Sequence, residues 1–200
     1  MKNKVLDKGF IEVVDSLGND LTVVNSARVS FGKRKSVWSA ADRRLVKYLA
    51  KYKHYSPFRH LQVQFHIKAP EFVMRQWYKH VVGIETTSNS SAKDHAWNEI
   101  SGRYVPVEDF YIPDVWRKQS EDRMIDAGMA KEQARIILPL NQYTEVYWTA
   151  SFQAVMNFIE LRNEKTSQIE IQEYAKVMLE QMKEVFPKTT KIWSEVNGWL

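Results

Sequence analysis

The side chains best suited to chemistry lie between Arg75 and Tyr104. The first six residues of this stretch follow Pro70, and we expect them to be helical. Proline is favourable in the first turn of a helix, where its missing N–H has no intrahelical partner. On such a helix Arg75 and Lys79 share one face, and Gln76 and His80 share a neighbouring one. The sequence therefore predicts two cations and an imidazole close together.

The end of this stretch is dense in hydrogen-bonding groups. An amide, a carboxylate, a hydroxyl and a guanidinium come from Asn98, Glu99, Ser101 and Arg103. Gly102 lies among them, and a glycine allows the backbone to approach a ligand closely. These donors suit a phosphorylated small molecule. A solvated helix end followed by a turn explains the same residue types equally well.

Composition limits the class of protein. The 200 residues are 44% hydrophobic and 12% aromatic, which is enough for one domain with a substantial core. No apolar run approaches the roughly 20 residues of a membrane span, and the start lacks the apolar segment of a signal peptide. We therefore expect a cytoplasmic protein with no membrane partner. The net charge of +5 favours anionic partners.

The sequence contains no cysteine, which excludes disulfides, zinc thiolates and a thiol nucleophile. His66 lies on the polar side of a predicted strand, and His54, His60 and His95 have no paired carboxylate at ligand spacing. We therefore predict no metal site.

Alternating hydrophobicity predicts the strands. Residues 61–69 alternate apolar and polar side chains without a fault, which is typical of a half-buried antiparallel strand. A shorter strand is expected over residues 10–14, ended by a turn at 18–20, and another over 145–149. Antiparallel strands interspersed with helices predict an α+β fold.

Helical spacing predicts helices over residues 20–29, 39–52 and 168–185 and a further one after Ser151. Asp20 and Ser39 are the expected caps of the first two, and Ser39 opens a capping-box pattern. The second helix is basic, with Arg43, Arg44, Lys47, Lys51 and Lys53 on or just after it. These cations are not interleaved with exposed aromatic side chains in any clear pattern, so we interpret them as a solvated face and expect no nucleic-acid partner.

Residues 75–80 and 98–104, together with residues 27–31, 110–113 and 130–140, resemble the flavin-dependent thymidylate synthases. The signature of that family is Arg-His-Arg followed by a serine in an Asn-Glu-x-Ser-x-Arg-Tyr context, and here residues 98–104 carry the second part. The resemblance runs from Lys8 to at least Ala175. It implies an antiparallel sheet flanked by helices in a single domain, residues 1–200, and a homotetramer with active sites shared between subunits.

The resemblance also implies an activity, the reductive methylation of dUMP to dTMP. Methylenetetrahydrofolate would supply the carbon, FAD the hydride, and NADPH the electrons that reduce the flavin. Because the chain has no cysteine, the pyrimidine must be activated without a thiol. In the family an arginine at the position of Arg162 faces the pyrimidine and favours ionisation at N3.

Site residues follow from the same resemblance. The catalytic residues would be Arg162 and Ser101, with Ser101 acting in binding and orientation rather than as a nucleophile. The substrate would be held by Gln76, Lys79, Glu99, Ser101, Gly102, Arg103, Arg135 and Arg162. The flavin would be held by Ser56, Lys79, His80, Val81, Glu99, Ser151, Gln153 and Asn157.

Departures from the family pattern gather on the flavin side. The Arg-His-Arg motif is here Lys79, His80 and Val81. Arg59 stands where the family often has an acid, and Ser151 and Gln153 stand where Asn and Arg usually serve the flavin diphosphate.

An inserted loop over residues 83–96 is also longer than the family norm. It either reshapes the substrate or folate entrance or is a tolerated insertion.

Two alternatives to the synthase stay open. One is a hydroxymethylase that acts on pyrimidine nucleotides with the same scaffold, and the other is a non-catalytic module that binds nucleotides or nucleic acid.

Overall fold

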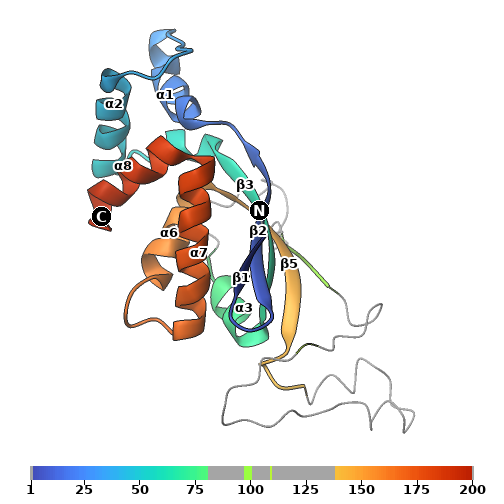
Figure 1. The fold of residues 1–200 in the computed structure, drawn as a ribbon. Helices are drawn as coiled ribbons and strands as arrows, with labels where there is room; N and C mark the ends of the chain where they lie inside the picture. The colour runs from blue at the N-terminus through green and yellow to red at the C-terminus, as the bar shows by residue number, and fades with distance from the viewer. Residues whose placement is uncertain (1, 81–96, 101–108, 110–137, 200) are drawn as a thin grey trace, which may run out of the picture.

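An antiparallel sheet forms the centre of the computed structural model, which describes residues 2–80, 97–100, 109 and 138–199. The described strands run in the order β1-β2-β3-β5-β4 (Figure 1). Their bounds are Lys2–Val5 for β1, Gly9–Leu17 for β2, Gln62–Pro70 for β3, Trp97–Glu99 for β4 and Tyr143–Ser151 for β5. The expected mixture of helices and an antiparallel sheet is confirmed, whereas the inserted loop 83–96 lies outside the described residues.

The central strand β3 has the predicted alternation. Val63, Phe65 and Ile67 are buried, while the intervening Gln64 and His66 are only half-buried. The neighbouring β5 is in register with it, with Phe65 opposite Trp148 and Ile67 opposite Val146. One face of the sheet is thus apolar and the other polar.

β2 is longer than the predicted strand over residues 10–14. The register with β3 shifts between Val13 and Asp15, which marks a bulge. A bulge breaks the alternation of side chains, so Val14 and Leu17 are 46% and 66% exposed although both are apolar. The end of β2 after the bulge therefore lacks the alternation of apolar and polar residues that would predict a strand.

Two helices cover the apolar face of the sheet: α6, Phe152–Arg162, and α7, Ile169–Val185 (Figure 1). Both were predicted, and Ser151 caps α6 by accepting a hydrogen bond from the Ala154 amide at 3.3 Å. Leu161 is 51% exposed although it is apolar, because it lies in the last turn, where the helix leaves the core. The remaining helices are α1, Asp20–Arg28, α2, Ala40–Lys51, α3, Glu71–Trp77, and α8, Pro187–Asn197. Among the described helices, none has both the length and the apolar character needed to cross a membrane.

The cap of α1 differs from the prediction. Asn19, rather than Asp20, accepts the cap hydrogen bond, from the Leu21 amide at 3.0 Å. Asp20 instead accepts from the Thr189 amide at 2.7 Å and from the Lys188 amide at 3.2 Å. The carboxylate therefore caps the first turn of α8, a distant segment whose first helical residue is a proline.

An aromatic cluster fixes α3 against α6 beneath the sheet. Trp77 at the end of α3 stacks on Phe158 of α6 with ring centres 4.2 Å apart, and it meets Trp148 of β5 edge-on at 5.7 Å. All three side chains are fully buried. Large stacked rings leave little freedom for the two helices to slide, so the side chains just beyond their C-terminal ends are held in a defined relation.

Candidate active site

Arg162, the last residue of α6, lies against the segment that follows α3. Its Nε donates a hydrogen bond to Nε2 of His80 at 3.0 Å, and its Nη2 donates to the carbonyl oxygen of Gln76 at 3.2 Å. These partners are 82 and 86 residues away in the sequence. The fold thus brings together three of the predicted site residues.

α3 is shorter than the sequence suggested, because it ends at Trp77 and His80 follows it. The His80 amide donates to the Trp77 carbonyl at 2.9 Å, which folds the chain back over the end of the helix. The ring of His80 then meets Phe158 edge-on at 5.0 Å. His80 therefore lies between an apolar wall and the guanidinium of Arg162.

Burial, together with the positive charge of Arg162, lowers the pKa of His80 to about 4. The ring is neutral at pH 7, as it must be for Nε2 to accept a hydrogen bond from a guanidinium. Burial also lowers the pKa of Arg162, but a guanidinium stays protonated in proteins. Arg162 therefore keeps a full positive charge next to an uncharged partner.

The guanidinium of Arg162 retains binding capacity. An arginine has five N–H donors, and the described residues accept from one on Nε and one on Nη2. No carboxylate within the described residues forms an ion pair with it. The remaining donors suit an anionic or carbonyl-bearing ligand.

Gln76 and Lys79, both predicted to border the nucleotide, lie next to this arginine in the chain segment 76–80. The Gln76 side chain donates to Oε1 of Gln168, the cap residue of α7, at 2.5 Å. Lys79 is exposed. The Gln76 side chain is thus held by its hydrogen bond to α7, whereas the Lys79 side chain is exposed to solvent.

Two of the predicted flavin residues, Ser151 and Gln153, lie at the opposite end of α6 from Arg162. Ser151 is buried as the cap of the helix, and Gln153 in its first turn is 3% exposed. Oε1 of Gln153 accepts a hydrogen bond from Nε of Arg59 at 2.7 Å. Arg59 belongs to a short 3-10 helix, η2, Ser56–His60, which begins with the exposed Ser56.

α6 separates the two groups by a fixed length. Gln153 and Arg162 are nine residues apart, which corresponds to roughly 14 Å at 1.5 Å per residue. Asn157 lies between them and is half-buried. One rigid helix therefore connects the predicted flavin residues with the predicted substrate arginine.

Five predicted site residues lie outside the described residues: Val81, Ser101, Gly102, Arg103 and Arg135. The chain leading to three of them is placed by β4, which pairs with β5 so that Glu99 is opposite Val146. The Ile100 amide continues this pairing by donating to the Glu145 carbonyl at 2.8 Å. Residues 99 and 100 thus lie alongside β5, at the end of the strand order that β4 occupies.

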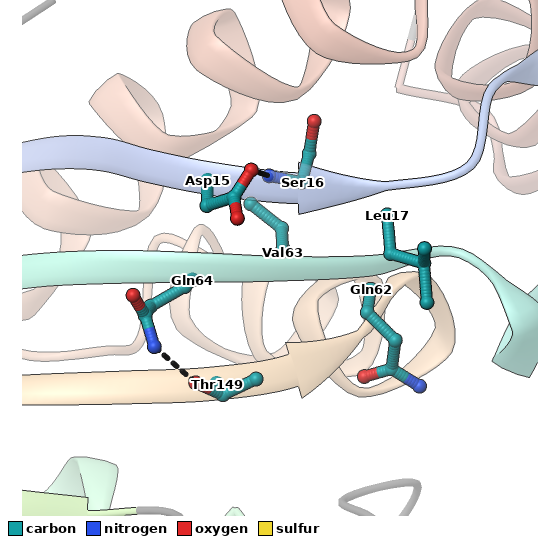
Figure 2. Close-up of a pocket in the computed structure, with 7 residues that line it drawn as sticks. All are labelled: Asp15, Ser16, Leu17, Gln62, Val63, Gln64 and Thr149. Atoms are coloured by element: carbon teal, nitrogen blue, oxygen red, sulfur yellow. Dashed lines mark hydrogen bonds between the residues drawn. The ribbon is translucent and has the colours of Figure 1, made fainter.

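A hollow of about 380 Å³ lies on the polar face of the sheet (Figure 2). Its lining comes from β2, β3 and β5 and consists of Asp15, Ser16, Leu17, Gln62, Val63, Gln64 and Thr149. The Gln64 amide donates to Thr149 Oγ1 at 3.1 Å across its floor. None of these residues was a predicted site residue, and only Gln62 and Gln64 had a sequence signal, as polar positions of the alternating strand. Within the described residues, no group of three or more His, Asp or Glu side chains is placed to hold a metal ion.

Known proteins resemble this chain over most of its length. Residues 12–188 match the family described as "Thymidylate synthase complementing protein". The flavin-dependent thymidylate synthase of Thermotoga neapolitana is 40% identical in an alignment that covers 94% of this chain and 92% of that protein. The enzyme of the same name from Thermus thermophilus is 37% identical over 92% of this chain and 74% of its own length.

A solved structure shares the fold. The UMP/dUMP methylase PolB from Streptomyces cacaoi, bound with 5-Br dUMP, superimposes with a TM-score of 0.78 at 26% identity. The alignment covers 96% of this chain and 97% of PolB. The family match, the relatives and the shared fold agree, and the chain belongs to the flavin-dependent thymidylate synthases.

Proposed function

We propose that this chain methylates dUMP to dTMP and that Arg162 activates the pyrimidine. Methylenetetrahydrofolate donates the carbon, bound FAD supplies the hydride chemistry, and NADPH reduces the flavin. The observation that carries the assignment is the hydrogen bond from Arg162 to neutral His80, which orients a guanidinium without neutralising it.

Activation by charge pairing fits a chain that has no cysteine. A guanidinium beside the imide of uracil stabilises the N3 anion, and loss of the N3 proton makes the C5 carbon of the ring more nucleophilic. Partial burial of Arg162 strengthens this effect, because charges interact more strongly where water is excluded. The N3 proton passes to solvent water, and no covalent bond to the protein is needed.

The residues present fit FAD as the bound cofactor. The end of α6 that carries Ser151 and Gln153 offers the guanidinium of Arg59, and the positive end of an 11-residue helix lies beside it. Such donors suit a diphosphate. We propose that Ser56 and Asn157 add polar contacts, and that Lys79, His80, Val81 and Glu99 reach the flavin from the other side.

The phosphate of dUMP is assigned to the segment that follows β4. Ser101, Gly102 and Arg103 would offer a hydroxyl, a backbone amide and a cation, and Arg135 would complete the clamp. Gln76, Lys79 and Glu99 would border the same pocket. The position of β4 at the β5 edge of the sheet supports this assignment, because it fixes where the segment begins.

We further propose a homotetramer with active sites shared between subunits. Apolar side chains exposed on the described surface support subunit contacts, since Val29, Phe31 and Val37 are 71%, 76% and 75% exposed. Light scattering of the purified protein tests the assembly, and a monomer would contradict it.

The reaction is tested with dUMP tritiated at C5, methylenetetrahydrofolate, FAD and NADPH. We expect tritium release and dTMP as the product. A hydroxymethylated product would favour the hydroxymethylase instead. Protein that does not bind FAD and releases no tritium would contradict both enzymes and favour a non-catalytic module.

A further inference from the structure

We propose that Arg59 holds the diphosphate of FAD, in place of the arginine that the family pattern has at the position of Gln153. The inference rests on the flavin-dependent function proposed above. It assigns a cofactor-binding role to a residue at which the family often has an acid.

Arg59 and Gln153 contact each other although they are 94 residues apart. Nε of Arg59 donates to Oε1 of Gln153 at 2.7 Å, and Gln153 is only 3% exposed. A buried amide is a rigid acceptor that carries no charge. Gln153 therefore orients the guanidinium and leaves its charge intact.

The backbone around Arg59 is also fixed. The side chain of Gln62 donates to the Arg59 carbonyl at 2.7 Å, and the Phe152 amide donates to the Leu61 carbonyl at 2.8 Å. These bonds tie η2 to the start of β3 and to the first residue of α6. Arg59 consequently stays next to the end of α6 that carries Ser151.

The charge of Arg59 is uncompensated within the described residues. Only its Nε is engaged there, and no described carboxylate pairs with it. Four N–H groups on the two Nη atoms remain from the five of an arginine. The side chain is exposed, so these donors face outward. Such a fork matches the oxygens of a phosphate in a bidentate manner.

The contact accounts for two departures from the family pattern at once. Where the family often has an acid at the first position and an arginine at the second, this chain has Arg59 and Gln153. The arginine is found at position 59 instead of position 153, and the two side chains are hydrogen-bonded to each other. The region around them therefore keeps one positive charge.

The first experiment measures flavin affinity rather than turnover. Flavin-free full-length protein is titrated with FAD, FMN and riboflavin while flavin fluorescence is followed, for the unsubstituted protein and Arg59→Gln. We expect Arg59→Gln to weaken FAD binding about tenfold to a hundredfold, the range typical of a hydrogen bond to a charged group. Riboflavin, which has no phosphate, should bind both proteins equally. Arg44→Gln removes an exposed cation from α2 and serves as the matched control, with no expected change.

A charge exchange provides the second experiment. Arg59→Glu should lose FAD affinity, and adding Gln153→Arg should restore most of it, because the double variant has the family arrangement. Thermal unfolding of each variant checks that the fold is kept.

Two results would overturn the role of Arg59. One is an unchanged FAD affinity in Arg59→Gln, and the other is an equal loss for FAD and riboflavin, which would indicate support of the fold alone. Neither affects the proposed reaction, since that is judged by tritium release and dTMP formation in the unsubstituted protein.

Discussion

Arg162 and His80 are joined by a hydrogen bond of 3.0 Å in which the arginine donates and the imidazole accepts. A carboxylate in the place of His80 would orient the guanidinium but cancel its charge. The neutral ring orients it and leaves the charge for a ligand. Arg59 is held in the same way by the neutral amide of Gln153. Arg162 and Arg59 are therefore both positioned next to α6 by uncharged acceptors.

Replacement of Arg162 by alanine should abolish turnover and keep the fold. The substitution removes the charge that stabilises the N3 anion, and the loss of one preorganised donor group typically lowers kcat about 100-fold to 1,000-fold. The measurement is tritium release from C5 of dUMP, with the melting temperature recorded for the same sample. Lys165→Ala, at an exposed position just after α6, is the control and should retain activity. Full activity in Arg162→Ala would remove the residue from the mechanism.

The low pKa of His80 predicts a pH-dependent stability. His80 titrates near 4 in the folded chain and near 6.5 when unfolded, so acidification protonates the unfolded state first. The stability contributed by neutral His80 is complete above pH 6.5 and is lost as the pH falls towards 4. Solvent screening of the half-buried ring reduces the expected loss to about 1 to 2 kcal/mol.

Urea unfolding at pH 7 and pH 4.5 measures this loss. His80→Gln keeps an uncharged acceptor for Arg162 but cannot be protonated in this range, so it serves as the reference. The unsubstituted protein should lose more stability than His80→Gln between the two pH values. Equal losses would mean that His80 titrates normally in the folded state.

Local sequence patterns predicted the helices and strands, but they did not predict the contacts between segments that are far apart in the sequence. The alternation of residues 61–69 predicted β3, because one-sided burial imposes a period of two. The cap of α1 was assigned to the wrong one of two adjacent side chains that can both cap. The Asp20 carboxylate instead accepts a hydrogen bond from the amide of Thr189, which is 169 residues away in the sequence.

The candidate site shows the same division. Resemblance identified Arg162 and His80 separately, but no spacing in the sequence predicts that they touch, because the packing of Trp77 on Phe158 sets that distance. Arg59 and Gln153 were recognised only as two unrelated departures. Their hydrogen bond, visible in the folded chain alone, connects them.

Ser101→Ala should weaken the binding of dUMP and leave the binding of FAD unchanged. The serine is proposed to donate its hydroxyl to the phosphate of the nucleotide, and a hydrogen bond to a charged group corresponds to about tenfold in affinity or more. Separate calorimetric titrations with dUMP and with FAD distinguish the two sites. Ser36→Ala, at an exposed position, is the control. A loss of FAD affinity as large as that of dUMP would contradict the assignment.

Asp42 predicts a second, more acidic stability transition, unrelated to catalysis. Burial alone would raise the pKa of this fully buried carboxyl, but hydrogen bonds from Ser39, Lys35 and Arg28 outweigh it and lower the pKa to about 2. A depressed folded pKa means that the stabilisation is complete above pH 3.8 and is lost as the pH falls towards 2.

Asp42→Asn tests this cluster at pH 7. The change removes the charge that Arg28 and Lys35 neutralise, at N–O distances of 2.8 Å and 3.2 Å, and should lower the free energy of unfolding by about 2 to 4 kcal/mol. Urea unfolding measures the loss, and the difference from the unsubstituted protein should shrink between pH 4 and pH 2. Glu180→Gln removes an exposed carboxylate paired with Lys183 and should change stability by less than about 0.5 kcal/mol. If both substitutions have equally small effects, the buried Asp42 carboxylate is not what fixes α2 against the segment that carries Arg28.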